Sequence, residues 1–318
     1  MLIAMLLSSG VVTARALQPQ ATSTADSCPS GWNCADVGAP TPPAPVATTA
    51  ATSTPLATAD APANTSAPRG PGGSWHLVFG DEFNGTSIDA TKWNTCYWWA
   101  GSDNGCANGG DGSMNYYLPY DVSEGNDLVD LVAQNKTVID SNGKTYNYVD
   151  GMIATNRTGS QTADKFSYTY GYMEMRAKLP AGWGYWPGFW LAASNHSWPP
   201  EIDAMEANGG DPHTVTLTIH WPNGTSGGGQ DSSNYSDPNV DFTNSYHTFG
   251  VDWEPNAVTW YVDGVVRKTF TSSAAIPATP MDVLANVAVN GNSGWAPSSS
   301  TVFPGHMLID YIRVWQKG

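Results

Sequence analysis

The sequence predicts an all-β fold in which two sheets pack face to face as a sandwich. From Trp75 to Gly318 the chain consists of short apolar segments separated by turn residues, and no long segment has the 3.6-residue period of a helix. The chain contains 33 Gly, 14 Trp and 14 Tyr among 318 residues, whereas charged residues make up only 13%, about half the usual share. About 244 residues is an ordinary length for one β-sandwich domain.

Residues 1–16 are predicted to be an export signal. The opening stretch MLIAMLLSSGVV is apolar, and Ala14-Arg15-Ala16 fits a small-x-small cleavage site, although the usual basic residues at the start are missing. The alternative is a buried helix, but the polar segment that follows gives such a helix no core to join. We therefore expect a secreted, extracellular protein.

Residues 17–73 are predicted to be a disordered linker. They are rich in Ala, Thr, Pro and Ser, and they contain almost no large apolar side chain that could offset the entropy of ordering. Cys28 and Cys34 lie inside this segment and are expected to close a small disulfide loop in an exported protein. Metal binding by this pair alone is disfavoured, because no His or further Cys is near.

Residues 74–318 form the predicted folded domain, and several of its strands can be placed from the pattern. The segments VTWYV (258–262) and VVRKTF (265–270) are rich in apolar and β-branched residues and flank Asp263-Gly264, which predicts a hairpin with a two-residue turn. Residues 247–253 precede this hairpin and extend it into a meander. Residues 307–315 alternate apolar and polar positions, so we expect them to pair deep in a sheet.

The charge balance excludes some partners. The formal net charge is −15, and a chain this acidic is repelled by the phosphates of nucleic acids. A membrane-spanning helix needs about 20 apolar residues, and the apolar runs here are short. We expect neither nucleic-acid binding nor a transmembrane segment, and we expect a monomer.

Cys96 and Cys106 are expected to form a disulfide. They are ten positions apart, and the Gly-rich segment between them can bring them together in an oxidising compartment. Zinc is the weaker alternative, because the six His are scattered and no Cys-x-x-Cys or His-x-His pair occurs.

The sharpest chemical signal is a triplet of carboxylates, Glu201, Asp203 and Glu206. In a strand, residues two apart share a face, so Glu201 and Asp203 point the same way, whereas Glu206 would point to the opposite face. One extra residue, a β-bulge at Ala204-Met205, places all three on one surface. The alternative is a solvated charged edge, but apolar and aromatic segments flank the triplet, and three like charges on one face are unfavourable.

Paired carboxylates have a defined use in cleaving glycosidic bonds. One carboxylate attacks the anomeric carbon, and the other, protonated, assists the leaving oxygen. Repulsion between neighbouring carboxylates raises the pKa of one of them and keeps a proton available. Four strand steps span roughly 13 Å, so the side chains must lean together, and spacing alone leaves the stereochemical outcome open.

The chain resembles glycoside hydrolase family 16, the laminarinase and lichenase group. The resemblance rests on ordered segments across nearly all of residues 74–318: WHLVFGDEFNGTSIDATKWN, YTYGYMEMRAKLPAGWGYWPGFWLAA, SWPPEIDAMEANGG, YHTFGVDWEPNAVTWYVDG, NVAVNGN and IDYIRVW. The third contains E-x-D-x-x-E, the bulged form typical of members that act on β-1,3-glucans.

The resemblance implies a concanavalin A-like β-jelly-roll sandwich with an open substrate cleft on the concave sheet. It implies a retaining double displacement on β-1,3- or mixed β-1,3-1,4-glucan, with no cofactor needed for the chemistry. By position, Glu201 is the nucleophile, Glu206 is the general acid/base, and Asp203 tunes the nucleophile.

Candidate substrate-binding residues come from aromatic rings that can stack on sugar faces and from polar groups that can meet their hydroxyls. The aromatic candidates are Trp186, Trp190, Trp198 and Trp221, with a core position for Trp190 left open. The polar candidates are Glu174, Arg176, His220 and Asn286. For Glu174 and Arg176 the resemblance implies contact with the sugar or with the catalytic carboxylates, and the alternative is a surface salt bridge. For His220 the alternative is a core position.

The resemblance also suggests a structural calcium, with Asp310 as its carboxylate ligand and carbonyl oxygens near Glu82 and Gly125. Met152, Tyr172 and Ser113 depart from residues that are common in laminarinases, which leaves the glucan preference open. The alternatives are a β-galactan hydrolase, a transglycosylase and a non-catalytic carbohydrate-binding protein, the last disfavoured by the intact carboxylate triplet.

Overall fold

The computed structural model describes residues 67–98, 106, 115–158, 161, 163–225, 228–291 and 295–318. The predicted export signal, most of the predicted linker and the Cys28–Cys34 loop lie outside these residues. Within them, the predicted all-β sandwich is confirmed. Two large sheets account for most of the described chain, and the described part contains no helix long and apolar enough to cross a membrane.

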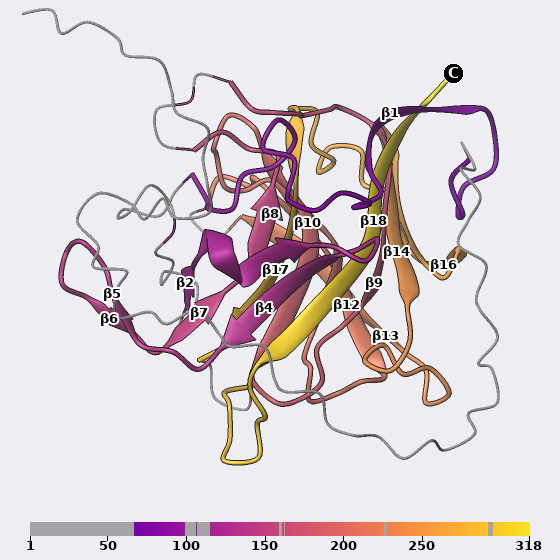
Figure 1. The fold of residues 1–318 in the computed structure, drawn as a ribbon. Coiled ribbons are helices and arrows are strands. Elements are labelled where there is room, and N and C mark those ends of the chain that lie inside the picture. Colours follow the sequence, from indigo (N-terminus) through magenta and orange to yellow (C-terminus); the bar gives the residue numbers. More distant parts are fainter. Residues whose placement is uncertain are drawn as a thin grey trace, which may run out of the picture. The chain divides into compact units, whose positions relative to one another are not determined.

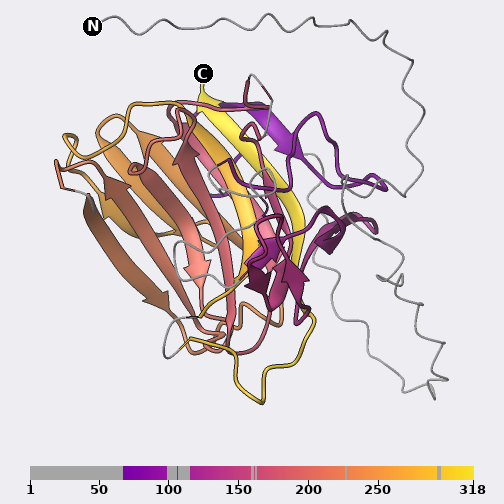
Figure 2. The same ribbon diagram turned by 90° about the vertical axis from the view of Figure 1, so that its left-hand side faces the viewer.

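The larger sheet has ten strands in the order β16-β15-β14-β9-β18-β4-β7-β2, with β1 paired to β18 and β3 paired to β4. Figures 1 and 2 show it as one layer of the sandwich. Its strands are β1 (Trp75–Asp81), β2 (Asn115–Tyr117), β3 (Val122–Glu124), β4 (Val129–Gln134), β7 (Tyr148–Asp150), β9 (Gly171–Lys178), β14 (His247–Glu254), β15 (Ala257–Val262), β16 (Val265–Phe270) and β18 (Gly305–Lys317).

The smaller sheet has six strands in the order β13-β12-β11-β10-β17-β8. Its strands are β8 (Met152–Ala154), β10 (Tyr185–Ala193), β11 (Glu201–Ala207), β12 (Thr214–Trp221), β13 (Gly229–Ser236) and β17 (Met281–Val289). A separate pair, β5 (Val138–Ile139) and β6 (Thr145–Tyr146), and the 3-10 turn η3 (Pro119–Asp121) complete the described elements.

The predicted hairpin and central strand are both present. Asp263 and Gly264 have positive φ values of 54° and 74° and join β15 to β16, as a type I′ turn requires. The long strand β18 pairs with β9, β4 and β1 (Figure 1). Its pairing with β9 shifts register between Ile309 and Tyr311, so Asp310 lies at an irregularity.

The core lies between the two large sheets. Side chains from the facing surfaces form one apolar cluster that includes Met173 and Met175 of β9, Phe189 of β10, Ile202 of β11 and Trp260 of β15. Because strand side chains alternate, the residues between these point away from the core. We call the side of each sheet that faces away from the other sheet its outer face.

Glu174 belongs to the outer face of the ten-stranded sheet. Its carboxylate accepts hydrogen bonds from the hydroxyls of Tyr172 (2.8 Å) and Tyr311 (2.7 Å) and from the backbone N–H of Arg69 (3.3 Å). Burial raises the pKa of Glu174, while these hydrogen bonds oppose the rise. The contact with Arg69 places part of residues 67–73 against β9, so the predicted disordered linker ends before Gly73.

Arg176 lies on the same outer face. Its Nη1 is 2.6 Å from Asp310 Oδ2, and its guanidinium lies 4.8 Å from the centroid of the Tyr246 ring. The carboxylate triplet is in the other sheet. The expectation that Glu174 and Arg176 hold the sugar or the catalytic carboxylates is therefore wrong. A two-residue period shows that two side chains share a face, but it does not show which sheet or which side they belong to.

We expect Glu174→Ala to destabilise the protein far more than Arg176→Ala. The first change leaves two buried tyrosine hydroxyls without an acceptor and should lower the free energy of unfolding by about 2 kcal/mol or more. The second removes a partly exposed ion pair worth about 1 kcal/mol or less. Denaturant unfolding of the two variants measures both effects, and equal losses would contradict the assignment.

Candidate active site

Strand β11 contains a β-bulge. Phe189 of β10 pairs with Met205, whereas the next residue, Trp190, pairs with Asp203, so Ala204 is an extra residue in the ladder. The pairing of β11 with β12 also shifts between Asp203 and Glu206. The bulge that the sequence predicts at 204–205 is present.

The bulge places the three carboxylates together on the outer face of the six-stranded sheet. Ile202 and Met205 are fully buried members of the core cluster. Glu201, Asp203 and Glu206 therefore point to the opposite side, because the extra residue restores the phase of Glu206.

Each carboxylate has a polar neighbour on β12. The cross-strand pairs are Glu201 with His220, Asp203 with Thr218, and Glu206 with Thr216. These β12 residues continue into β13 through pairs that also carry polar side chains: His220 with Gln230, Thr218 with Ser232, and Thr216 with Asn234. We call these six residues of β12 and β13 the polar ladder. The sequence analysis missed it, although the alternation in TVTLTIHW is its signal.

Two tryptophans donate hydrogen bonds to the first and last carboxylates of the triplet, Glu201 and Glu206. Trp186 Nε1 lies 2.8 Å from Glu206 Oε1, and Trp198 Nε1 lies 3.2 Å from Glu201 Oε2. Both residues were predicted to stack on the sugar, and both lie beside the triplet. An indole N–H that donates a hydrogen bond to a carboxylate oxygen fixes the orientation of that carboxylate.

His220 also lies at the triplet. Its Nε2 is 3.6 Å from Glu201 Oε1 and 3.7 Å from Asp203 Oδ2. Burial, and secondarily the charge of Lys268, lower the pKa of His220. The imidazole is therefore neutral at neutral pH and serves as a polar neighbour of Glu201 and Asp203 rather than a fixed positive charge.

Burial strongly perturbs Asp203. It is only 3% exposed, and its Oδ2 atom makes no hydrogen bond. Burial raises the pKa of Asp203 well above its usual range, the charges of Glu201 and Glu206 raise it further, and Lys268 opposes the rise. Asp203 therefore keeps a proton at pH values at which an exposed aspartic acid has lost it.

Trp190 and Asn286 form a pair on the same outer face. Trp190 Nε1 donates a hydrogen bond to Asn286 Oδ1 at 2.9 Å. Trp190 pairs with Asp203 across β10 and β11, so the question left open by the sequence is answered: its ring is not part of the core between the sheets.

Trp221 does not lie with the carboxylates. It follows the inward positions Leu217 and Ile219 in the two-residue period of β12, and its ring packs 5.3 Å from that of Phe270 in the other sheet. The expectation that Trp221 stacks on the sugar is therefore wrong. Trp221 is the last residue of its strand, and the sequence there does not indicate which face of the strand it occupies.

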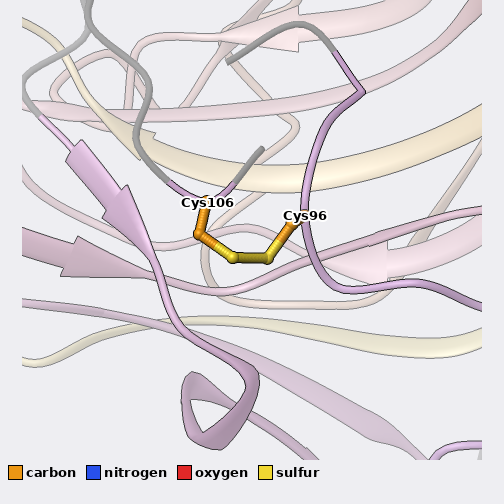
Figure 3. The surroundings of a disulfide bond; sticks show 2 residues. All are labelled: Cys96 and Cys106. Atoms are coloured by element: carbon orange, nitrogen blue, oxygen red, sulfur yellow. A yellow bond between two sulfur atoms is a disulfide. The ribbon is translucent and has the colours of Figure 1, made fainter. Parts of the chain in front are cut away.

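The predicted Cys96–Cys106 disulfide is formed, with the two Cα atoms 4.7 Å apart (Figure 3). The next residue, Tyr97, packs at 5.0 Å from the Tyr117 ring and 6.0 Å from the Trp190 ring, and it belongs to a cluster with side chains of β8, β10 and β17. This cluster covers the β8–β17 part of the outer face.

Asp282 is a buried acid that the sequence analysis missed. It pairs with Ala192, which in turn pairs with Glu201, so it lies two strands from the triplet in the same row. Asp282 is 0% exposed, and neither of its carboxylate oxygens makes a hydrogen bond. Burial, followed by the charge of Asp164, raises the pKa of Asp282 to about 8, against the opposing charge of Arg157.

The Asp310 carboxylate, the expected calcium ligand, forms an ion pair: its Oδ2 lies 2.6 Å from the Arg176 guanidinium. The side-chain oxygens of Glu82 accept hydrogen bonds from Arg313 at 2.7 and 2.6 Å. The other expected ligands are backbone carbonyl oxygens near Glu82 and Gly125, and a calcium ion at Asp310 stays a prediction.

Among the described residues, one group has ligand atoms close enough together for a metal ion. Glu201, Asp203 and His220 each offer an atom, all within 4.8 Å of one another. An ion held there would occupy the carboxylates of Glu201 and Asp203. We therefore treat these three residues as part of the carboxylate site and assign them no metal.

Known proteins are similar to the part of the chain that contains the carboxylate triplet. The model of the glycosyl hydrolases family 16 matches residues 125–313. An endo-1,3-1,4-β-glycanase of Rhizobium meliloti is 32% identical over 254 residues, which cover 75% of this chain and 51% of that protein. A glucan endo-1,3-β-glucosidase of Niallia circulans is 34% identical over 271 residues, which cover 76% and 38%. The chain thus spans about half or less of the length of these curated relatives.

A solved structure matches at the level of the fold. The laminarinase catalytic domain of Thermotoga maritima has a TM-score of 0.67 and 33% identity, and the match covers 77% of this chain and 99% of that domain. The two large sheets described above therefore correspond to the jelly-roll sandwich of that domain.

We expect Asp282→Asn to stabilise the protein, and increasingly so as the pH rises. The raised pKa means that the folded state holds a proton on Asp282 up to about pH 8, whereas the unfolded chain releases it near pH 4. Stability from this group is therefore complete below about pH 4 and falls as the pH rises toward 8. The asparagine removes this dependence.

Thermal unfolding of both proteins at pH 5, 6, 7 and 8 tests this expectation. The difference in Tm should widen by several degrees across the series. A constant difference at all four pH values would show that Asp282 is ionised in the folded protein.

Proposed function

The chain belongs to glycosyl hydrolase family 16, and on this premise we propose that it is a retaining endo-glycosidase that cleaves β-1,3- or mixed β-1,3-1,4-glucan. The observation that carries the proposal is the bulge of β11, which holds Glu201 and Glu206 on one face with the buried Asp203 between them. A pair of carboxylates that flanks the scissile bond serves glycoside hydrolysis, and the resemblance of the E-x-D-x-x-E segment to the family implies the retaining form.

The first step forms a covalent glycosyl-enzyme. A carboxylate oxygen of Glu201 attacks the anomeric carbon while Glu206 donates its proton to the glycosidic oxygen, so the bond to the leaving sugar breaks as the bond to Glu201 forms. In the second step Glu206 removes a proton from water. The hydroxide equivalent attacks the same carbon and releases Glu201, which restores both groups to their starting states.

The neighbours of the triplet suit these roles. Trp198 donates a hydrogen bond to Glu201 and Trp186 donates one to Glu206, so an indole N–H helps to orient each carboxylate. A proton on Asp203 removes one of three adjacent negative charges, which lets Glu201 stay ionised for the attack. No cofactor enters either step.

The choice of glucan is supported by the relatives. The Rhizobium meliloti protein is named for 1,3-1,4-β-glycan cleavage and the Niallia circulans protein for 1,3-β-glucan cleavage. The outer face combines indole rings at Trp186, Trp190 and Trp198 with the polar ladder, which matches the flat faces and hydroxyl edges of a sugar chain. Export is part of the same proposal and is supported by the Cys96–Cys106 disulfide.

We expect Glu201→Gln and Glu206→Gln to separate the two roles. On laminarin and lichenan, Glu201→Gln should lower kcat by about 10³-fold or more, because no nucleophile remains. Glu206→Gln should lose activity on polysaccharide but keep part of it on an aryl glycoside, whose leaving group needs no proton. Added azide should then rescue the second step and yield a β-glycosyl azide.

Glu254→Gln, which removes an acid paired with Lys317 away from the site, is the matched control and should keep its activity. The wild type is also assayed on agarose, and on glucan in the presence of a high concentration of acceptor sugar. Preferred cleavage of agarose would show a galactan hydrolase, and dominant transfer products would show a transglycosylase. Full activity of Glu201→Gln would contradict the mechanism.

A further inference from the structure

The catalytic bulge is held from the opposite sheet. Trp260, on β15 of the ten-stranded sheet, is fully buried, and its Nε1 donates a hydrogen bond to the backbone carbonyl of Asp203 at 2.7 Å. Asp203 immediately precedes the extra residue Ala204. The indole N–H therefore bonds the backbone at the point where the strand ladder is interrupted.

Lys268 binds the next two strands of the six-stranded sheet, β12 and β13. From β16, its Nζ donates hydrogen bonds to the carbonyl of Leu217 on β12 (2.9 Å) and to the carbonyl of Asp231 on β13 (2.8 Å). The same ammonium group lies 2.6 Å from Asp231 Oδ1, and its side chain is only 8% exposed. A buried lysine that makes three such contacts is fixed in position.

The two side chains act as one unit. Trp260 and Lys268 are cross-strand partners, and Nζ lies 4.6 Å from the centroid of the indole ring. From one position in the ten-stranded sheet, they therefore bond the backbone of β11, β12 and β13 in turn. We call this pair the cross-sheet tether.

The hydrogen bond from Trp260 to the Asp203 carbonyl favours the bulge in β11. A bulge leaves a residue unpaired, and an unpaired carbonyl in a core is unfavourable unless another donor meets it. Without the bulge, the strand would continue in regular phase and Glu206 would turn toward the core. A donor aimed at the Asp203 carbonyl favours the bulged register over the regular one.

We propose that Trp260 and Lys268 are positioning residues of the active site, which keep Glu206 in phase with Glu201 and supply a buried positive charge behind the carboxylates. The inference rests on the proposed function for its catalytic meaning. Neither side chain lies on the outer face, so neither touches the substrate. They act through the backbone of β11 and through the field at Asp203.

The charge part of the proposal follows from the groups that face Asp203. These are Glu201 and Glu206 on β11, His220 on β12 and Lys268 behind them, and Lys268 is itself paired with Asp231 of β13. Lys268 lowers the pKa of both Asp203 and His220. Because the carboxylates titrate as a coupled set, removing this positive charge makes every deprotonation of the set occur at higher pH.

The hydrogen bond is tested with two tryptophan variants of the full chain. Trp260→Phe removes the N–H that meets the Asp203 carbonyl. Trp253→Phe, the matched control, removes an equally buried N–H of the same sheet that donates to the Pro277 carbonyl at 3.0 Å. Both should lose similar Tm. We expect Trp260→Phe alone to lower kcat on laminarin by about tenfold or more at little-changed KM, and equal kcat in both variants would overturn the positioning role.

The charge is tested with Lys268→Met and Lys268→Arg. The methionine variant should move the whole pH profile of kcat/KM to higher pH by about half a unit or more, and the arginine variant should restore the wild-type profile. An unmoved profile in Lys268→Met would overturn this part. If that variant does not fold, the two tryptophan variants decide the proposal.

A readout without substrate separates this inference from the proposed function. The pKa of the Asp203 carboxyl, followed by ¹³C NMR in wild type and Lys268→Met, should rise when the lysine charge is removed. If the wild type does not cleave any glucan while this rise is seen, the proposed function fails and the tether stands. If the wild type is active and no rise is seen, the charge role of Lys268 fails while the proposed function stands, and the tryptophan variants decide the role of the hydrogen bond.

Discussion

The site depends on the two-residue period of a β-strand and on one interruption of it. Side chains five positions apart fall on opposite faces of a regular strand, so Glu201 and Glu206 could not act on the same bond. The extra residue Ala204 moves Glu206 onto the face of Glu201, while Met205 remains in the core. The chemistry proposed for this chain therefore rests on a backbone irregularity, and the surrounding residues serve to fix it.

Both sheets contribute to that irregularity. The six-stranded sheet supplies the carboxylates and the indoles that orient them, and the ten-stranded sheet supplies the Trp260 hydrogen bond to the bulge and the Lys268 charge behind it. The buried acids Asp203 and Asp282 lie in adjacent rows of one outer face, and burial raises the pKa of each. Burying these two acids therefore reduces fold stability at pH values at which their unfolded forms are ionised.

Much of this arrangement could be predicted from the sequence because its signals are local. Alternation and turn residues predicted the sandwich and the 263–264 hairpin, and the E-x-D-x-x-E spacing predicted the bulge. What failed depends on contacts between distant segments. Glu174 and Trp221 fit a period of two, but the period does not reveal which side of which sheet a residue joins. The ion pair of Asp310 with Arg176, 134 positions away, could not be predicted for the same reason, because only the fold brings the two residues together.

The anomeric configuration of the first product, followed by ¹H NMR during hydrolysis of a β-glucan, tests the central claim most directly. Double displacement through Glu201 and Glu206 gives a β-configured product that only later equilibrates by mutarotation. A product that first appears in the α configuration would mean that water attacks directly across a wider gap, and it would contradict the placement of Glu201 and Glu206 as nucleophile and acid/base on one face.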